Sequence, residues 1–173
     1  MRKSKWLILL LLIALLITAC GQGTDDGQEP KGLEGGVIEK EAFSVFVPKN
    51  WYVMPVTEDE PDRIQMHTHA RDELSAMNRP GIQIIYYGPE SSNYPPPRDF
   101  YDNVEDLESQ TFGDLTWNGY SCELAGNPML IMWVEGDGNP IFMQTAVWLE
   151  LGGREIALED EDVKAIFESI SIK

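Results

Sequence analysis

The sequence predicts an α+β protein in which an antiparallel β-sheet packs against two or more helices. Short alternating or β-branched segments, each bounded by turn residues, indicate antiparallel strands. Two other segments carry apolar residues at helical spacing. These segments all lie in residues 37–173, which show no internal linker or repeat and suffice for a single domain with a hydrophobic core.

The first half of this domain opens with extended structure. Pro48 closes a β-rich run, Lys49-Asn50 forms a turn, and the run resumes at Trp51. Residues 71–79 are predicted to be a loop or one helical turn. The predicted strands are residues 43–48, 51–54, 63–70 and 81–87.

The two segments at helical spacing are residues 98–111 and 159–170. In the first, Phe100, Val104 and Leu107 form an apolar stripe with acidic residues opposite, which predicts an amphipathic helix. In the second, the stripe is Val163, Ile166, Phe167 and Ile170, and acidic residues crowd its start. Acidic side chains near a helix N-terminus are stabilised by its unpaired N–H groups, so we assign this acidic cluster to the helix and not to calcium.

Between these helices the sequence predicts a meander of antiparallel strands. Asn-Gly and Gly-Gly pairs permit the positive φ angles of tight hairpins. Turns are therefore predicted at 118–119, 126–128, 136–140 and 152–153, separating strands at 114–117, 120–125, 129–135, 141–151 and 154–158.

The order of these segments resembles the PsbP-like superfamily, which includes an extrinsic photosystem protein and many small bacterial lipoproteins. The resemblance covers most of residues 38–173 and rests chiefly on FSVFVPKNW (43–51) and DVKAIFESISI (162–172). It implies an antiparallel sheet between helices and a binding or assembly factor without a shared set of catalytic residues. No site residue carries over from it.

The N-terminus has the three parts of a secretory signal peptide, residues 1–19: a basic start, an apolar run over residues 6–17, and small residues. The apolar run is shorter than the roughly 20 residues of a permanent transmembrane anchor, which is the less favoured alternative. Ile17-Thr18-Ala19-Cys20-Gly21 resembles the lipobox of bacterial lipoproteins. The resemblance implies cleavage between Ala19 and Cys20, a diacylglycerol on the Cys20 thiol, and an acyl group such as palmitate on the new amino group.

Residues 20–36 have the composition of a flexible linker, with six glycines between Gly21 and Gly36. They would tether the domain to the bilayer through the lipid on Cys20. We therefore expect a lipid-anchored protein on the extracytoplasmic face of the cell membrane, with the bilayer as its first partner.

The net charge of the chain is −16, and removing the signal peptide leaves ten Lys and Arg against 29 Asp and Glu, or −19. So acidic a protein repels phosphate backbones, which excludes nucleic acid as a partner. The acids serve solubility or, alternatively, attract a basic partner. The membrane anchor and the tether separately suggest an envelope protein or complex as a partner.

Cys122 has no partner for an intrachain disulfide if Cys20 carries lipid. It stands in a strand-like alternation, and free cysteine commonly packs as a small hydrophobic residue. We predict that Cys122 is a core residue and not a nucleophile.

His67 and His69 are the histidines of the chain. On a strand their rings would point to the same face, as two metal ligands should, and Asp62, Asp72 or Glu73 would add a carboxylate. A metal site needs three or four convergent ligands, so the alternative is that both are ordinary exposed side chains.

The tryptophans and tyrosines lie mainly in predicted strands, where core packing is the expected role. The exception is Tyr94-Pro95-Pro96-Pro97. A polyproline segment is a known docking shape because little entropy is lost when it binds, so these residues form either a partner contact or only a stiff connector.

No nucleophile elbow, zinc-protease, phosphate-loop or dinucleotide motif occurs in the sequence, and we assign no catalytic residue. We expect a non-enzymatic binding or interaction module with no cofactor other than the covalent lipid. The alternatives are a receptor for a small ligand or metal and, third, a cell-envelope enzyme.

Overall fold

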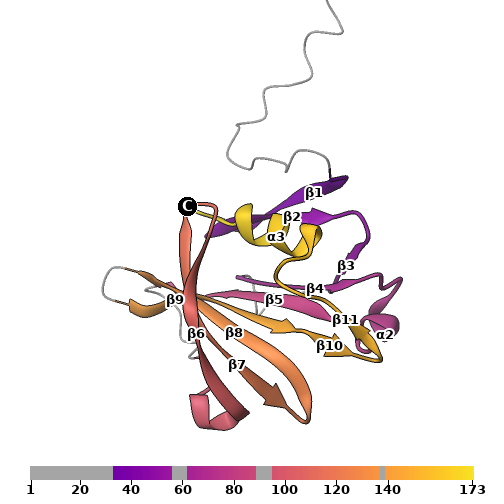
Figure 1. Ribbon diagram of the computed structural model, residues 1–173. Coiled ribbons are helices and arrows are strands. Elements are labelled where there is room, and N and C mark those ends of the chain that lie inside the picture. Colours follow the sequence, from indigo (N-terminus) through magenta and orange to yellow (C-terminus); the bar gives the residue numbers. More distant parts are fainter. Residues whose placement is uncertain (1–32, 56–61, 89–94, 137–138) are drawn as a thin grey trace, which may run out of the picture.

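The computed structural model describes residues 33–55, 62–88, 95–136 and 139–173. Within these ranges the chain is a mostly antiparallel β-sheet protein with two short helices, so it is α+β broadly while its helices are few. A large twisted sheet carries a smaller sheet and a helix on one face (Figure 1).

Seven strands form the larger sheet, and every neighbouring pair is antiparallel. The strand Gly81–Tyr86 pairs with the strand Asn139–Trp148, which places Ile84 opposite Thr145. This pairing joins the two halves of the chain. The spatial order is β3 (Trp51–Val53), β4 (Arg63–Thr68), β5 (Gly81–Tyr86), β9 (Asn139–Trp148), β8 (Asn127–Gly136), β7 (Leu115–Leu124) and β6 (Asp102–Phe112).

The smaller sheet has the order β1 (Gly35–Glu39), β2 (Phe43–Pro48) and β12 (Ser171–Ile172), and helix α3 (Glu161–Glu168) leads into β12. Strand β1 begins two residues before residue 37, the predicted start of the domain. The other elements are α2 (Glu73–Ala76), the 3-10 turn η1 (Arg98–Phe100) and the hairpin of β10 (Glu150–Leu151) and β11 (Arg154–Glu155).

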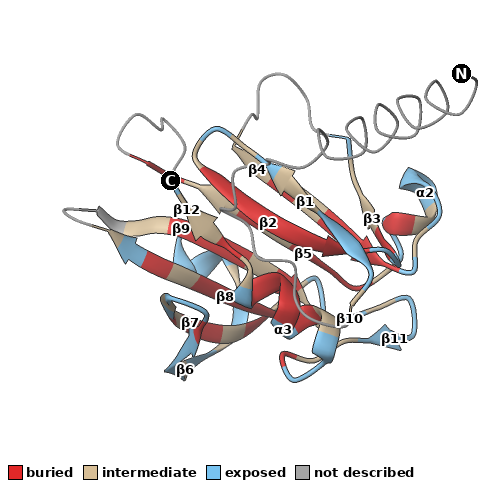
Figure 2. Ribbon diagram, turned by 90° about the horizontal axis from the view of Figure 1, so that it is seen from above, coloured by how far each residue is buried: buried red, intermediate tan, exposed pale blue. Residues whose placement is uncertain are grey.

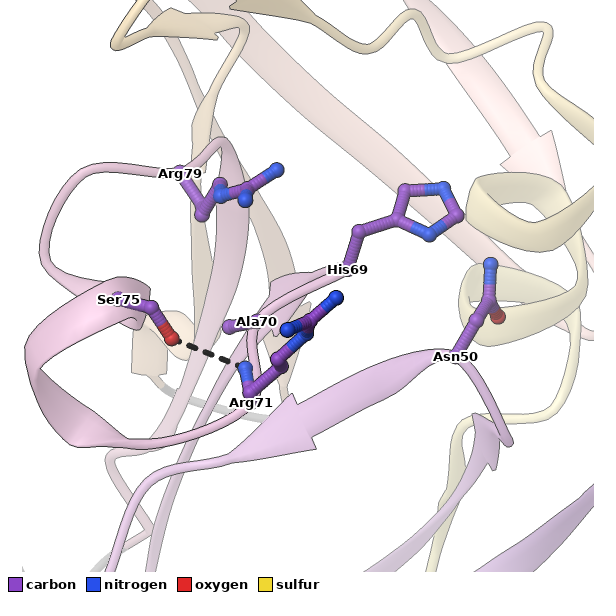
Figure 3. Close-up of a pocket in the computed structure, with 6 residues that line it drawn as sticks. All are labelled: Asn50, His69, Ala70, Arg71, Ser75 and Arg79. Carbon is purple, nitrogen blue, oxygen red and sulfur yellow. Dashed lines mark hydrogen bonds between the residues drawn. The ribbon is translucent and has the colours of Figure 1, made fainter.

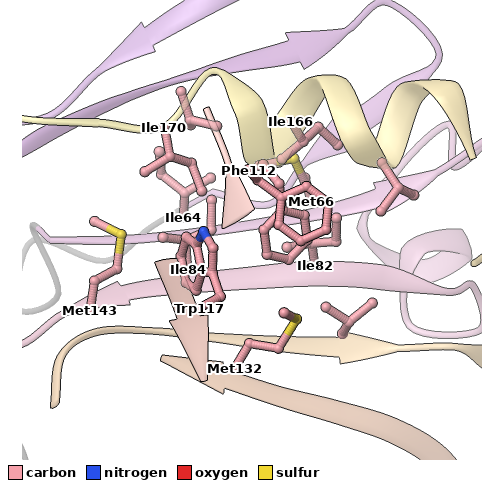
Figure 4. Packing of buried hydrophobic residues seen from close by; sticks show 14 of the residues in the cluster. Ile64, Met66, Ile82, Ile84, Phe112, Trp117, Met132, Met143, Ile166 and Ile170 are labelled. Atoms are coloured by element: carbon pink, nitrogen blue, oxygen red, sulfur yellow. The ribbon is translucent and has the colours of Figure 1, made fainter. Parts of the chain in front are cut away.

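The main core lies between the larger sheet and the layer formed by β2 and α3 (Figures 2 and 4). All six residues of β2 are buried. Helix α3 presents Phe167 to the sheet, where its ring lies 5.1 Å from that of Phe112 and 5.2 Å from that of Trp117. The aromatic residues of α3, β6 and β7 thus belong to one continuous core. The apolar stripe of the helix faces the sheet, as predicted.

A second, smaller cluster packs on the other face of the sheet around Tyr120, Cys122, Met129 and Ile131. The Cys122 side chain is 4% exposed and its thiol is free, which confirms its prediction as a core residue. Burial raises the pKa of Cys122 to about 11, so the thiol is protonated at neutral pH and is a poor nucleophile.

The prediction of a helix over residues 98–111 is wrong. Only Arg98–Phe100 form a 3-10 turn, and Asp102–Phe112 are strand β6. Val104 packs toward the second cluster and Leu107 toward the main core, on opposite faces of the sheet. Two apolar side chains three residues apart share one face of a helix, but they point to opposite faces of a strand. The spacing of Val104 and Leu107 therefore fits an amphipathic helix and equally fits a strand with apolar contacts on both faces.

The hairpin turn predicted at Asn118-Gly119 is also wrong, because both residues lie inside β7. A Cβ atom at Gly119 would lie 2.8 Å from the Ile131 carbonyl oxygen of β8, so this glycine permits a close approach of two strands. Asn118 accepts a hydrogen bond from Ser109 and donates one to Glu135 across the sheet. The reversal between β6 and β7 occurs instead at Gly113-Asp114.

Most of the other predicted elements within the described residues are found with shifts of a few residues at their ends. The strand predicted at 154–158 is only Arg154–Glu155, and the strand predicted at 141–151 is divided at Leu149 into β9 and β10. Gly152 and Gly153 have φ angles of 63° and 70° in the β10–β11 turn, and residues 71–79 contain the single helical turn α2. No helix in the described ranges is both long and apolar enough to cross a membrane.

Candidate functional site

An open pocket of about 730 Å³ lies where the end of β4, the turn before β3 and helix α2 meet. In Figure 3 the Arg71 and Arg79 side chains extend toward the side on which His69 and Asn50 lie. The lining residues are Asn50, His69, Ala70, Arg71, Ser75 and Arg79.

The loop that follows β4 forms one wall of the pocket. The His69 N–H donates to the Asn50 carbonyl oxygen at 2.8 Å, which fastens the end of β4 to the turn before β3. His69 has a φ of 51°, in the left-handed region that non-glycine residues rarely adopt. This backbone turns the chain out of the sheet, so residues 69–71 border the pocket and do not extend the strand.

Helix α2 forms the opposite wall and is held by a capping box. The Asp72 carboxylate accepts the Ser75 N–H at 2.8 Å, and the Ser75 hydroxyl oxygen accepts the Arg71 and Asp72 N–H groups at 2.9 and 3.1 Å. The bond from Ser75 is the main cause that lowers the pKa of Asp72, and the charge of Arg71 adds to it. The Ser75 hydroxyl therefore orders the wall of the pocket.

The charge of the lining is opposite to that of the protein. Arg71 and Arg79 line the pocket and no acidic side chain does, although the chain carries a net charge of −16. Neither arginine forms an ion pair with an acid of the described residues. A guanidinium group offers a planar fork of donors that matches carboxylate and phosphate oxygens, so this arrangement can hold an anionic group.

The buried residue His67 is hydrogen-bonded to the backbone of the pocket residue Arg79. The His67 ring, 4% exposed, bonds through Nδ1 to the Arg79 carbonyl oxygen at 3.0 Å and through Nε2 to Gln65 Nε2 at 2.9 Å. Because the Gln65 amide nitrogen can only donate, the His67 proton lies on Nδ1 and is donated to Arg79. Burial lowers the pKa of His67, against the smaller opposing effect of its hydrogen bonds with the backbone of Arg79 and Pro80.

The structure separates the two histidines that were considered as a metal pair. His67 lies in β4 with both ring nitrogens bonded, while His69 lies beyond the end of the strand at Thr68, where alternation of side chains no longer applies. The Asp72 carboxylate is used as the cap of α2. Within the described residues no three His, Cys, Asp or Glu side chains are close enough together to hold a metal ion.

The other residues singled out in the sequence lie elsewhere. Ala19, Cys20 and Tyr94 lie outside the described residues. Pro95 is half-buried, Pro96 and Pro97 are exposed, and Pro97 has the polyproline II angles φ −63° and ψ 149° before η1. Every tryptophan and tyrosine in the described ranges is buried or half-buried, which confirms their predicted packing role.

Sequence reasoning missed Arg71, Arg79, Asn50 and Ser75 as site residues. The available signal was a pair of arginines on either side of one helical turn in a chain rich in acids. Asn50 had been assigned only to a turn, and it reaches the pocket because β3 pairs with β4.

The fold and the site together define a mostly antiparallel β-sheet protein with an arginine-lined pocket at one edge of its larger sheet. No protein-family model matches the chain, and no curated protein sequence matches it either.

Proposed function

We propose that this chain is a lipid-anchored lipoprotein whose domain is a non-enzymatic binding module on the extracytoplasmic face of the cell membrane. The pocket between β4 and α2 receives an anionic group of its ligand, a carboxylate or a phosphate. The signal peptide, the lipobox ending at Cys20 and the glycine-rich linker support the location.

The observation that carries the ligand class is the pair Arg71 and Arg79. With 29 acidic residues in the chain, a structural arginine has many acids with which to pair, as Arg98 does with Asp106 at 2.7 Å. The two pocket arginines instead share one cavity with His69 and Asn50, which add further polar groups. Convergent donors that form no ion pair with an acid of the described residues favour an external anion.

The lining suits binding better than chemistry. The Ser75 hydroxyl donates to the Asp72 carbonyl oxygen at 2.9 Å and accepts two backbone N–H groups, so it is committed to the helix cap. The metal-binding alternative has less support, because both ring nitrogens of His67 are already bonded within the protein.

We also propose a distant relationship to the PsbP-like superfamily. Strand β2 with Trp51, and helix α3 leading into β12, correspond to the two motifs on which that resemblance rests. The Trp51 indole donates to Asp162 at 2.7 Å, so the two motifs are also in direct contact. The strand at residues 102–112, where a helix was expected, departs from the resemblance.

The proposed function is tested by thermal unfolding of the full chain in phosphatidylcholine nanodiscs, with phosphate, glycerol phosphate or succinate at a matched ionic strength of chloride. A ligand at a hundred times its Kd adds about 2.7 kcal/mol to the free energy of unfolding, which raises Tm by about 5 to 10 °C. We expect such a shift for at least one of these anions.

The control is needed because phosphate also stabilises proteins through exclusion from their surface. The double variant Arg71→Gln with Arg79→Gln is expected to lose the specific shift. Lys40→Gln with Lys164→Gln makes the same change of charge outside the pocket and is expected to keep it. Equal shifts in the parent and in the arginine variant would disprove the anion site.

A further inference from the structure

Helix α2 exposes two large apolar side chains beside the pocket. Leu74 is 81% exposed and Met77 is 67% exposed, whereas Ala76 on the same turn is fully buried. Phe100, at 59%, is the other large hydrophobic residue of the described ranges that is exposed, and it lies in η1. The helix thus turns its small Ala76 side chain inward, while Leu74 and the C-cap residue Met77 expose large apolar side chains to solvent.

Leu74 and Met77 are three residues apart on a helical turn, so they project from the same side. Arg71 and Arg79 flank this turn in sequence and line the pocket next to it. Asp72 and Glu73 are the acids of the turn; Asp72 caps the helix, and neither lines the pocket. Apolar side chains flanked by arginines are the pattern of a surface that lies at the interface of a membrane.

We propose that α2 and its pocket contact the anionic phospholipid surface of the membrane to which the chain is anchored. Arg71 and Arg79 bind the phosphate of a lipid headgroup, while Leu74 and Met77 enter the boundary between headgroups and acyl chains. This inference rests on the proposed function, because it names the source of the anion that the pocket binds.

Charge favours this face over the rest of the domain as the one that meets the bilayer. A chain with a net charge of −16 is repelled by anionic lipids. It therefore approaches them with the face on which two arginines lie together, with no acidic side chain in the pocket lining and no ion pair to an acid of the described residues. A single acyl chain or a single weak patch binds a membrane only marginally, whereas two combined signals bind it stably.

The test uses the full lipidated chain in nanodiscs that contain equal amounts of phosphatidylcholine and phosphatidylglycerol, with a trace of phosphatidylglycerol that carries a diazirine in its acyl chain. Illumination links the lipid to nearby side chains, and mass spectrometry locates the adducts. We expect adducts concentrated on residues 72–79. Nanodiscs of phosphatidylcholine alone, with a matched phosphatidylcholine probe, should give far fewer adducts there.

Variants separate the two kinds of contact. Arg71→Gln with Arg79→Gln should lower the adducts on residues 72–79 about tenfold, since each arginine near an anionic surface contributes to the attraction. Leu74→Ser with Met77→Ser should lower them too while leaving the thermal shift with phosphate intact. Phe100→Ser, a matched exposed apolar residue outside the pocket, should leave the adducts unchanged.

Adducts spread evenly over the domain, or equally frequent with the phosphatidylcholine probe, would overturn the inference. If phosphate still raised Tm through Arg71 and Arg79, the anion site would stand and its ligand would be a soluble or protein-borne anion. If phosphate gave no shift that depends on the arginines, the proposed function and this inference would fail together.

Discussion

Among single residues, His67 connects the buried interior of the larger sheet to the pocket. Its Nδ1 proton is donated to the Arg79 carbonyl oxygen at 3.0 Å, so a neutral ring in the core sets the backbone position of a pocket arginine. Gly81 permits this packing, because a Cβ atom there would lie 2.6 Å from His67 Nδ1. The residue that supports the site is thus buried and does not line the pocket.

The lowered pKa of His67 predicts a pH dependence of stability. Its ordinary pKa is 6.5. Because the unfolded chain binds this proton at a higher pH than the folded chain does, the free energy of unfolding falls as pH drops below about 6.5, until the folded state is protonated too. His67→Asn keeps a donor toward Arg79 but cannot titrate.

Urea unfolding between pH 7.5 and pH 5 measures this effect. Acidic side chains add their own slope, so the quantity of interest is the difference between the parent and His67→Asn. We expect the parent to lose more stability over this range than the variant. Parallel profiles for the two proteins would show that His67 does not couple folding to pH.

At the scale of elements, strand β7 shows how a turn-like dipeptide serves inside a sheet. Asn118 bonds across to both neighbouring strands, and Gly119 lies against the backbone of β8. The same two residues in an isolated peptide favour a type I′ hairpin turn. Their role here depends on the approach of Ile131 on the neighbouring strand β8.

Replacing Gly119 with alanine tests this assignment. The added Cβ atom would lie 2.8 Å from the Ile131 carbonyl oxygen, so two strands would have to move apart. We expect a loss of about 1 to 3 kcal/mol in the free energy of unfolding, measured with urea. Gly36→Ala on β1, where no atom lies within 4 Å of the new Cβ, is the control and should change stability little. A Gly119→Ala protein as stable as the parent would contradict the close packing of β7 on β8.

At the scale of the whole molecule, one core joins the two sheets and α3. Phe167 contacts both Phe112 and Trp117, and all three are buried. Buried aromatic side chains contribute much of the free energy of folding of a domain. Since the pocket is built on the edge of the same sheet, its geometry depends on this core.

The variant Phe167→Ala should therefore lower the free energy of unfolding by about 3 to 5 kcal/mol, a large fraction of the total for an ordinary domain. Urea unfolding should show a lower midpoint with an unchanged slope, as expected for one cooperative unit. Phe100→Ala removes an aromatic ring that is 59% exposed and should have a small effect. A small effect of Phe167→Ala as well would place α3 outside the cooperative core.

The sequence by itself determined the elements whose local and tertiary preferences agree. Strands β2, β4 and β5, helix α3 and the buried position of Cys122 follow from alternation, turn residues and the apolar stripe. In these segments the contacts with the rest of the fold favour the same structure as the local sequence does.

Tertiary structure decided the elements with an ambiguous pattern, and it decided the pocket. Residues 102–112 became a strand because β7 supplies hydrogen-bonding partners along their length and two bulges absorb the irregular spacing. Arg71, Arg79 and Asn50 converge because β3 pairs with β4 and His67 holds the loop before β5. Such convergence depends on contacts between segments far apart in the chain, which periodicity and local motifs do not encode.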